Sequence, residues 1–426
     1  MVVSLAHTRR GRSRLQIVAG AWPGPARRLF AARFLRSLAQ GYLVVDFTLY
    51  LRLLHWSASA IGALLAGSFV LGAVLSLLVG PASDRCGCKP LLVGYELAIA
   101  LAFFATAWTT NPWVIGCAAV FAGFGRGANG APGCFVPAEL SWLARIVPAA
   151  RRGAAYSINT AMGFIGMGLG ALLAMTPAFW TRLLPDAAGY RPLFLLGGGI
   201  AVAIASLLAA TPEQLPCTPA EREARAPPPR SAPLRRSERR RLWQIAIISL
   251  LSGVSLGLSG PLIAYWLAVK FRVDPMHIAP VLAVAFVAAA LSAFATAWLA
   301  ERFGAARSFV FLQGFGTLLL FSFPFIPSFT LAAAVWILRF AIERGATGAM
   351  EAVIMGLVRA HKRGLAGGLG TASLALPRAL GPLAAGYWIA AGDLATPFVI
   401  AAALQSIYAT LFGIAFFSRD RSITDS

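Results

Sequence analysis

Long runs of apolar residues, separated by short polar segments, fill the chain between Arg36 and Phe417. A helix needs ~20 residues to cross a bilayer, and the runs are of that order. Backbone amides in hydrocarbon must bond within their own segment, so we expect these runs to be helices. Short alternating segments, which would indicate a membrane barrel of strands, are not apparent. The pattern therefore predicts an all-α polytopic membrane protein.

Twelve runs are predicted as membrane helices, six on either side of a polar, proline-rich segment. The first six are Arg36–Leu54, Ala58–Val79, Leu91–Thr109, Trp113–Val136, Gly153–Met175 and Pro192–Ala210. The second six are Leu242–Val269, Ile278–Ala300, Ser308–Ile326, Phe329–Val358, Gly364–Ala391 and Ala395–Phe417. The predicted domains are a basic tail (1–35), a first six-helix bundle (36–210), a linker (211–241), a second bundle (242–417) and a short tail (418–426). The linker lacks periodicity and is interpreted as a tether.

Composition excludes an ordinary soluble protein, because 58% of residues are hydrophobic and only 12% are charged. The net charge of +21 does not indicate nucleic-acid binding. Of the 37 Lys and Arg residues, 28 fall in segments on one predicted side of the membrane and five on the other. This asymmetry places both termini and the linker in the cytoplasm, where the excess charge faces anionic lipid. Arginine greatly outnumbers lysine, which fits a GC-rich bacterial genome and an inner-membrane location.

A charged island, Gly80-Pro-Ala-Ser-Asp-Arg-Cys-Gly-Cys-Lys-Pro90, separates the second and third runs. Its spacing G-x-x-x-D-R-x-G-x-K resembles the loop between helices 2 and 3 of major facilitator superfamily transporters, and Glu301–Arg307 is a weaker second copy. The resemblance covers Arg36–Phe417 and implies two bundles that rock about a central site. It also implies a cytoplasmic gate made of Gly80, Asp84, Arg85, Gly87, Lys89, Glu301, Arg302 and Gly304. A tight cytosolic turn rich in Gly, Asp and Arg remains the alternative.

The two halves share further sequence. Arg126-Gly-Ala-Asn-Gly-Ala in the fourth run matches Arg344-Gly-Ala-Thr-Gly-Ala in the tenth, and Arg152-Gly153 matches Arg363-Gly364. Together with the charged island and its second copy at Glu301–Arg307, these make three matches in the same order, which indicate a duplicated six-helix unit. Transporters built from such repeats bind their substrate near the bilayer midplane, between the two halves.

Asp46 lies near the middle of the first run, with Tyr42 and Tyr50 one turn away on either side. An ionisable residue at bilayer depth is a functional hypothesis by default, because its charge is costly there. Burial disfavours the charged form of a lone carboxylate, which suits a group that binds and releases a proton. The alternative is a structural partner for a neighbouring arginine or helix end.

Arg126 begins the sequence R-x-x-N-G, which resembles the family's helix 4 motif R-x-x-Q-G with Asn129 in place of Gln. The resemblance implies a position near the central cavity and a part in proton coupling. Close helix packing through Gly123, Gly127 and Gly130 is the competing interpretation.

The tenth run carries Arg339, Glu343 and Arg344, and the eleventh carries Arg378. Arg339 and Glu343 are four residues apart and can pair along one face, whereas Arg344 and Glu351 are expected on another face. Arg378 has no acidic partner in its own run. Glu96 and Glu139, near the cytoplasmic side, are expected to bind loop arginines.

The deep positions hold four cations (Arg126, Arg339, Arg344 and Arg378) and two acids (Asp46 and Glu343). This balance favours an anionic or zwitterionic solute over a lipophilic cation.

A Gly-Pro sequence at Ala379–Gly386 resembles one that exporters of the family carry in helix 5, although here it falls in the eleventh run. The fifth run is rich in glycine and lacks the proline.

The sequence therefore predicts a proton-coupled transporter that moves a small organic solute across a bacterial inner membrane by alternating access, with export favoured. The alternatives are proton symport that takes up an organic anion or zwitterion, and a non-transporting receptor or assembly factor. No catalytic constellation or phosphate-cradling loop is present, so neither an enzyme nor a cofactor is expected. The Cys86 and Cys88 pair lacks the companions of a metal site. The expected partners are lipid, solute and protons, and the expected state is a monomer.

The resemblance implies that Asp84 and Arg85 pair with a neighbouring helix end and stabilise the outward-facing state. We expect Asp84→Asn to raise the population of the inward-facing state, which a distance measurement across the cytoplasmic face would report. An unchanged distance distribution would contradict a gating role for this carboxylate.

Overall fold

The computed structural model describes residues 22–126, 136–148, 151–181, 183–184, 186–213, 236–357 and 376–424. Every regular element in these ranges is a helix. The first half contains α2 (Gly24–Leu53), α3 (Ala58–Cys86), α4 (Cys88–Trp108), α5 (Pro112–Ala122), α6 (Val136–Ile146), α7 (Arg152–Leu173), α8 (Pro177–Trp180), η3 (Asp186–Tyr190) and α9 (Arg191–Ala209). The second contains α11 (Arg236–Ser259), α12 (Ile263–Phe271), α13 (Pro275–Phe303), α14 (Ala305–Ser322), η4 (Phe323–Phe325), α15 (Phe329–Leu357), α17 (Leu380–Ala390) and α18 (Thr396–Thr424).

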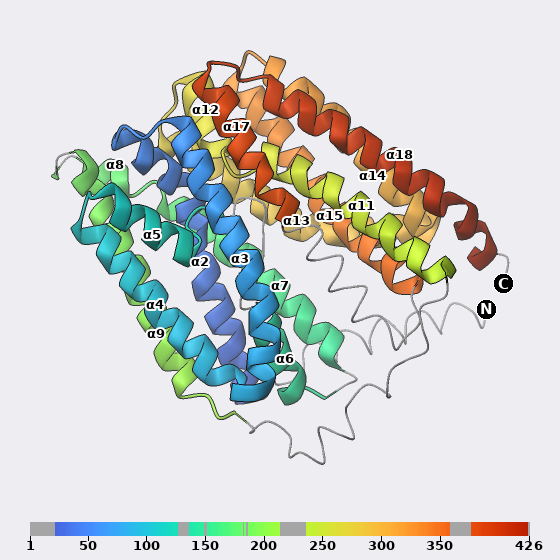
Figure 1. The fold of residues 1–426 in the computed structure, drawn as a ribbon, viewed down its shortest axis with the longest axis horizontal. Coiled ribbons are helices and arrows are strands. Elements are labelled where there is room, and N and C mark those ends of the chain that lie inside the picture. Colours follow the sequence, from blue (N-terminus) through green and yellow to red (C-terminus); the bar gives the residue numbers. More distant parts are fainter. Residues whose placement is uncertain are drawn as a thin grey trace, which may run out of the picture.

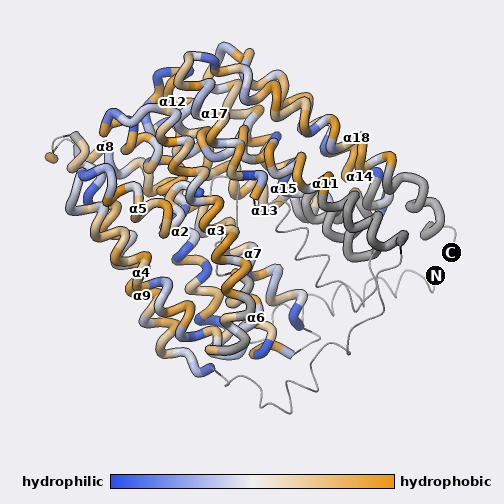
Figure 2. Tube along the Cα trace, in the orientation of Figure 1, coloured by the Kyte–Doolittle hydropathy of each residue, from blue (hydrophilic) through white to orange (hydrophobic). Residues whose placement is uncertain are grey.

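The predicted all-α membrane architecture is confirmed. Among the described residues, seven helices are long and apolar enough to cross a membrane, or eight when α11 and α12 are counted as one bent span. The remaining predicted runs are α2 and α15, which carry several charges, and α5 and α17, whose described parts are short. Figure 2 shows apolar positions along most of the helices and hydrophilic positions mainly towards their ends.

The first helix is longer than its apolar run. It begins at Gly24, whereas the prediction began near Arg36. In this added part Leu29 and Phe30 are buried while Arg27 is exposed. The segment is therefore an amphipathic helix that packs against the bundle with one face, which a search for uniformly apolar residues does not find.

The charged island was expected to be a loop between two helices, and most of it is helical instead. The α3 helix continues to Cys86, and Gly87 alone separates it from α4. α11 and α18 likewise extend into the predicted linker and tail, to Arg236 and Thr424. Polar residues mark where these helices leave the apolar layer, and a helix bonds its own backbone equally well beyond that layer.

Two predicted spans are interrupted. The helix expected over Trp113–Val136 ends at Ala122, where Gly123 adopts φ 72°, the left-handed conformation that ends many helices. The run predicted at Leu242–Val269 divides into α11 and α12, which bend by 40° at their junction. Pro261 lies at that junction and has no backbone N–H to continue the helix.

The turns between the helices lie at two opposite ends of the bundles, the linker end and the distal end. The linker end carries Gly87, Gly304 and Glu213, and the distal end carries His55 and Gly392. At the distal end, Asp393 accepts hydrogen bonds from the amides of Ala395 and Thr396 at the start of α18. Hydrogen bonds, chiefly from Thr396, hold the pKa of the Asp393 carboxyl below its usual value.

The halves repeat each other in detail. Gly87 and Gly304 both have φ 87°, and each is the single residue between two long helices. α2 and α7 approach closely at Gly41 and Gly170, just as α11 and α17 do at Gly257 and Gly381. These pairs occupy corresponding places in the two halves, which supports the duplication that the sequence indicates.

The bundles meet mainly near the distal end. α3 packs against α17, α7 against α13 and α2 against α12. Gly62 of α3 lies so close to α17 that an added Cβ would overlap the carbonyl oxygen of Pro382. Arg52 at the end of α2 lies over the Tyr265 ring of α12, with 5.8 Å between the guanidinium carbon and the ring centroid. Figure 1 shows the two sets of helices diverging from this end towards the linker end.

We expect Gly62→Ala to destabilise the protein by about 1–3 kcal/mol, because the methyl group pushes α3 away from α17. The free energy of unfolding, measured by denaturant titration of the detergent-solubilised protein, would show the loss. Gly94→Ala is the matched control, since a Cβ there meets nothing within 4 Å. That control is expected to be neutral or stabilising, and equal effects of the two changes would contradict the close approach.

Candidate functional site

Asp46 lies inside the first bundle. Its side chain is buried, and neither carboxylate oxygen has a hydrogen-bond partner among the described residues. Tyr42 and Tyr50 lie on the same stripe of α2, and both are buried. The Tyr50 ring contacts Tyr190 and Phe194, with centroids 5.5 and 5.0 Å apart. The stripe therefore faces η3 and α9 in its own bundle.

Arg126 follows the break in the fourth span. The left-handed Gly123 and Gly125 turn the chain so that the Arg126 guanidinium points back at α3. Its Nη1 donates a hydrogen bond of 3.0 Å to the carbonyl oxygen of Ser68. A Cβ on Gly72 would overlap this guanidinium, so the glycine leaves the space that the arginine fills. Asn129, the other residue of the predicted motif, lies outside the described residues.

The charges of α15 form a buried cluster. Arg339 Nη2 lies 2.9 Å from Glu343 Oε2, which confirms the predicted pair. Arg344 was expected on another face, but its Nη2 lies 3.0 Å from Glu343 Oε1. The long guanidinium side chain reaches the adjacent residue's carboxylate although the two Cα–Cβ bonds diverge. One carboxylate is thus shared by two guanidinium groups, and Arg339 also donates to Ser259 of α11.

Arg378 lies at the contact between the bundles. It is buried just before α17, and its guanidinium carbon lies 5.8 Å from the centroid of the Phe69 ring in α3. Phe69 forms a small apolar cluster across the bundles with Ala66 and Ala379. The Nε of Arg378 is buried and has no hydrogen-bond partner among the described residues.

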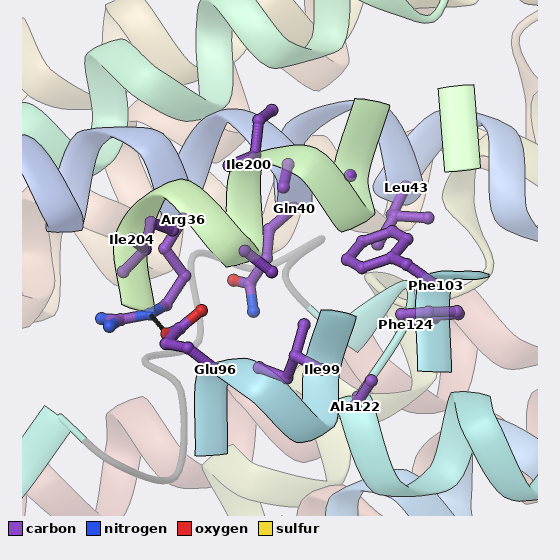
Figure 3. Close-up of a pocket in the computed structure, with 14 residues that line it drawn as sticks. Arg36, Gln40, Leu43, Glu96, Ile99, Phe103, Ala122, Phe124, Ile200 and Ile204 are labelled. Atoms are coloured by element: carbon purple, nitrogen blue, oxygen red, sulfur yellow. Dashed lines mark hydrogen bonds and ion pairs between the residues drawn. The ribbon is translucent and has the colours of Figure 1, made fainter. Parts of the chain in front are cut away.

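An ion-pair triad in the first bundle was only partly anticipated. Arg36 Nε lies 2.7 Å from Glu96 Oε1, and its Nη1 lies 2.5 Å from Glu139 Oε2. The two acids were expected to bind loop arginines, but their partner is a residue of α2. Figure 3 shows Arg36 and Glu96 pointing towards each other beside a cavity lined also by Phe103 and Ile204. The cavity, about 30 Å³, is large enough for about one water molecule.

The predicted gate is described only in part. The structure does not describe the side chains of Asp84, Arg85 and Glu301 or the surroundings of Gly80. Arg302 is exposed and lies over the rings of Trp298 and Phe303, 5.4 and 5.7 Å from their centroids.

Glu213, which the sequence analysis did not single out, caps the helix that follows the first gate motif. Its carboxylate accepts hydrogen bonds of 2.6 and 3.0 Å from the amides of Cys88 and Lys89. Negative charge is favourable at a helix N-terminus. No local pattern indicated this contact, because Glu213 lies at the far end of the first half.

The chain is similar in sequence to a known protein family. The profile of the Major Facilitator Superfamily matches residues 29–338 and 245–425. A search of curated proteins returned no match.

Solved structures share the fold. The nucleoside transporter NupG has a TM-score of 0.68 at 15% identity, covering 93% of this chain and 99% of its own. A bacterial homologue of the human lysosomal transporter Spinster, inward-facing and unoccupied, has a TM-score of 0.70 at 16% identity over 93% and 98%. The D-xylose–proton symporter has a TM-score of 0.68 at 15% identity over 90% and 96%.

We expect Arg36→Met to cost about 3–5 kcal/mol of unfolding free energy, because it leaves two buried carboxylates without their shared partner. Denaturant or thermal unfolding of the detergent-solubilised protein would measure the loss. Adding Glu96→Gln and Glu139→Gln to the same variant should restore much of the stability. Arg27→Gln, at an exposed arginine of the same helix, controls for the loss of one positive charge. A single variant as stable as that control would contradict the triad.

Proposed function

Because the chain belongs to the major facilitator superfamily, we propose that this membrane transporter moves a small organic solute and couples that movement to protons. Two bundles with a duplicated helix order, which meet near one end, are suited to alternating access. The arginine distribution supports a bacterial inner membrane with the linker end in the cytoplasm.

The observation that carries the proton-coupling proposal is the isolation of Asp46. An ionised carboxylate with no hydrogen bond or ion pair is very costly in an apolar interior, whereas the protonated form costs far less. The titratable groups near it in the described structure are three tyrosines: Tyr42 and Tyr50 on its own helix, and Tyr190 at the end of η3. None of them supplies a positive charge. Asp46 therefore holds a proton in this arrangement and releases it when bundle motion admits water.

The contacts between the two bundles support an assignment of the transporter's conformational state. The close contacts between α3 and α17 and between α2 and α12 lie near the distal end. With the linker end in the cytoplasm, this is the inward-facing state. Gly62 and its α17 contact would then separate when the transporter opens to the outside.

Export is the direction that we propose. The Gly-Pro segment of α17 carries the contact with α3 at Gly62, which has to open and close during transport. It resembles the segment that exporters of the family carry in helix 5, the counterpart of helix 11 in the other half. Uptake by proton symport is the second candidate, supported by the isolated carboxylate and by a fold shared with the D-xylose–proton symporter.

Proton binding tests the proposal without a known substrate. The purified protein in unbuffered detergent solution is titrated from weakly acidic to alkaline pH. We expect Asp46→Asn to bind about one proton fewer than the unaltered protein, because asparagine does not titrate there. Asp393→Asn is the control: its lowered pKa keeps Asp393 ionised throughout this range. Equal proton uptake with and without Asp46 would contradict the proposed coupling.

The pH inside everted vesicles separates the candidates. Organic acids, amino acids and organic cations are added outside, on the cytoplasmic face, and a trapped dye reports the internal pH. Exchange of exported solute for protons makes the lumen more alkaline, whereas symport makes it more acidic. A lumen that responds to no solute would favour a receptor, and either response should disappear in Asp46→Asn.

A further inference from the structure

We propose that Arg126 and Arg378, one from each bundle, form an oxyanion-binding site at a single turn of α3. The site rests on the proposed function, for which it would supply the substrate-binding cations. Its ligand class is a small organic molecule bearing a carboxylate or a phosphate. Both groups present oxygen pairs that match the forked donors of a guanidinium.

The first half of the site is Arg126. Its Nη1 is anchored on the Ser68 carbonyl, which fixes the guanidinium beside Gly72. Its Nη2 is buried and has no hydrogen-bond partner among the described residues. Among the described residues this guanidinium is held by one neutral carbonyl and has donors to spare. Burying such a group costs free energy unless an anion accepts hydrogen bonds from its remaining donors.

The second half is Arg378, which reaches the same turn of α3 from the other bundle. Its guanidinium lies over Phe69, and Phe69 falls between Ser68 and Gly72 in the sequence. The ring contact stabilises a cation only modestly. Arg378 is 6% exposed, and its Nε has no acceptor among the described residues.

The neighbouring acid, Glu343, is shared among more cations than one carboxylate can neutralise. Glu343 is the one carboxylate that the structure describes in the buried α15 cluster. Its oxygens lie against Arg339 and Arg344, and its charge also attracts Arg378. Asp46 lies in the interior of the first bundle without an ion pair among the described residues. The cations described near this turn therefore outnumber the carboxylates, as an anion-binding site requires.

The division between bundles gives the site a link to transport. Arg126 moves with α3, whereas Arg378 moves with α17. An anion that contacts both is bound most tightly when the bundles approach at this turn, and more weakly when they part. Binding would thus differ between the two states, which is the condition for a ligand to shift their populations.

The test uses the purified full-length protein in detergent, with thermal unfolding measured at constant ionic strength. The probes are succinate, citrate and glycerol 3-phosphate, with dimethyl succinate as the neutral analogue and tetraphenylphosphonium as a cation. We expect at least one oxyanion to raise the unfolding midpoint by several degrees and the other two compounds to leave it unchanged. A response to succinate or citrate and not to glycerol 3-phosphate would assign the carboxylate, and the reverse would assign the phosphate.

Substitutions test whether Arg126 and Arg378 cause the anion-dependent rise of the unfolding midpoint. Arg378→Met and Arg126→Gln should each abolish the anion-dependent rise, and Arg378→Lys should retain part of it because the charge remains without the fork. Arg27→Gln, far from the turn, should respond like the unaltered protein. A rise that persists in both Arg378→Met and Arg126→Gln would overturn the proposal, as would stabilisation by the neutral or cationic probe alone.

Stability without ligand distinguishes a binding role from a structural one. Arg378→Met should leave the unliganded protein equally or more stable, because it removes a buried cation whose nearby carboxylate, Glu343, already contacts Arg339 and Arg344. Arg339→Met is the matched contrast in the same bundle and should lower stability, since it removes a partner of Glu343. A clear loss of stability in unliganded Arg378→Met would assign this arginine to structure and overturn the site.

The two proposals can fail separately. If Asp46→Asn removes a proton but no oxyanion stabilises the protein, the anion site is wrong and proton coupling stands. If oxyanions bind through both arginines while proton uptake is unchanged in Asp46→Asn, the site stands and the coupling is wrong.

Discussion

A buried charge needs a partner in an apolar interior, and this requirement accounts for much of the structure. Arg36 satisfies two carboxylates at once, and in doing so it ties together α2, α4 and α6. Glu343 does the converse for Arg339 and Arg344 in the second bundle. These groups hold helices in place because separating any partner would leave a bare charge in an apolar environment.

The requirement is not met everywhere. Among the described residues, Asp46 has no hydrogen-bond or ion-pair partner, and one buried nitrogen of Arg126 and one of Arg378 have no acceptor. Proteins tolerate such costs where function needs them. Two of these cases bear on the proposed function: a lone acid inside one bundle, and two cations at one turn of α3. The first suits a proton and the second suits an anion, so one physical constraint leads to both proposals.

The sequence predicted the order of the helices well and several of their limits poorly. Hydropathy located the apolar runs because it reports what lies in the bilayer. It did not predict that α3 continues through the charged island to Cys86, since a helix needs no apolar residues once outside. It also missed the break at Gly123, because glycine is compatible both with close packing inside a helix and with a left-handed turn. Among the candidate residues, Arg339 and Glu343 could be paired from their spacing alone.

The sequence by itself determined the membrane class, the family resemblance, the duplicated halves and the presence of too many deep cations. Each of these depends on composition or on spacing along one segment. Only the tertiary structure decided which charges are satisfied. Arg36 lies far from Glu96 and Glu139 in the chain, and Arg126 and Arg378 come from opposite halves to one turn of α3. Ion pairing depends on distance in space, and helix packing alone brings such distant residues together.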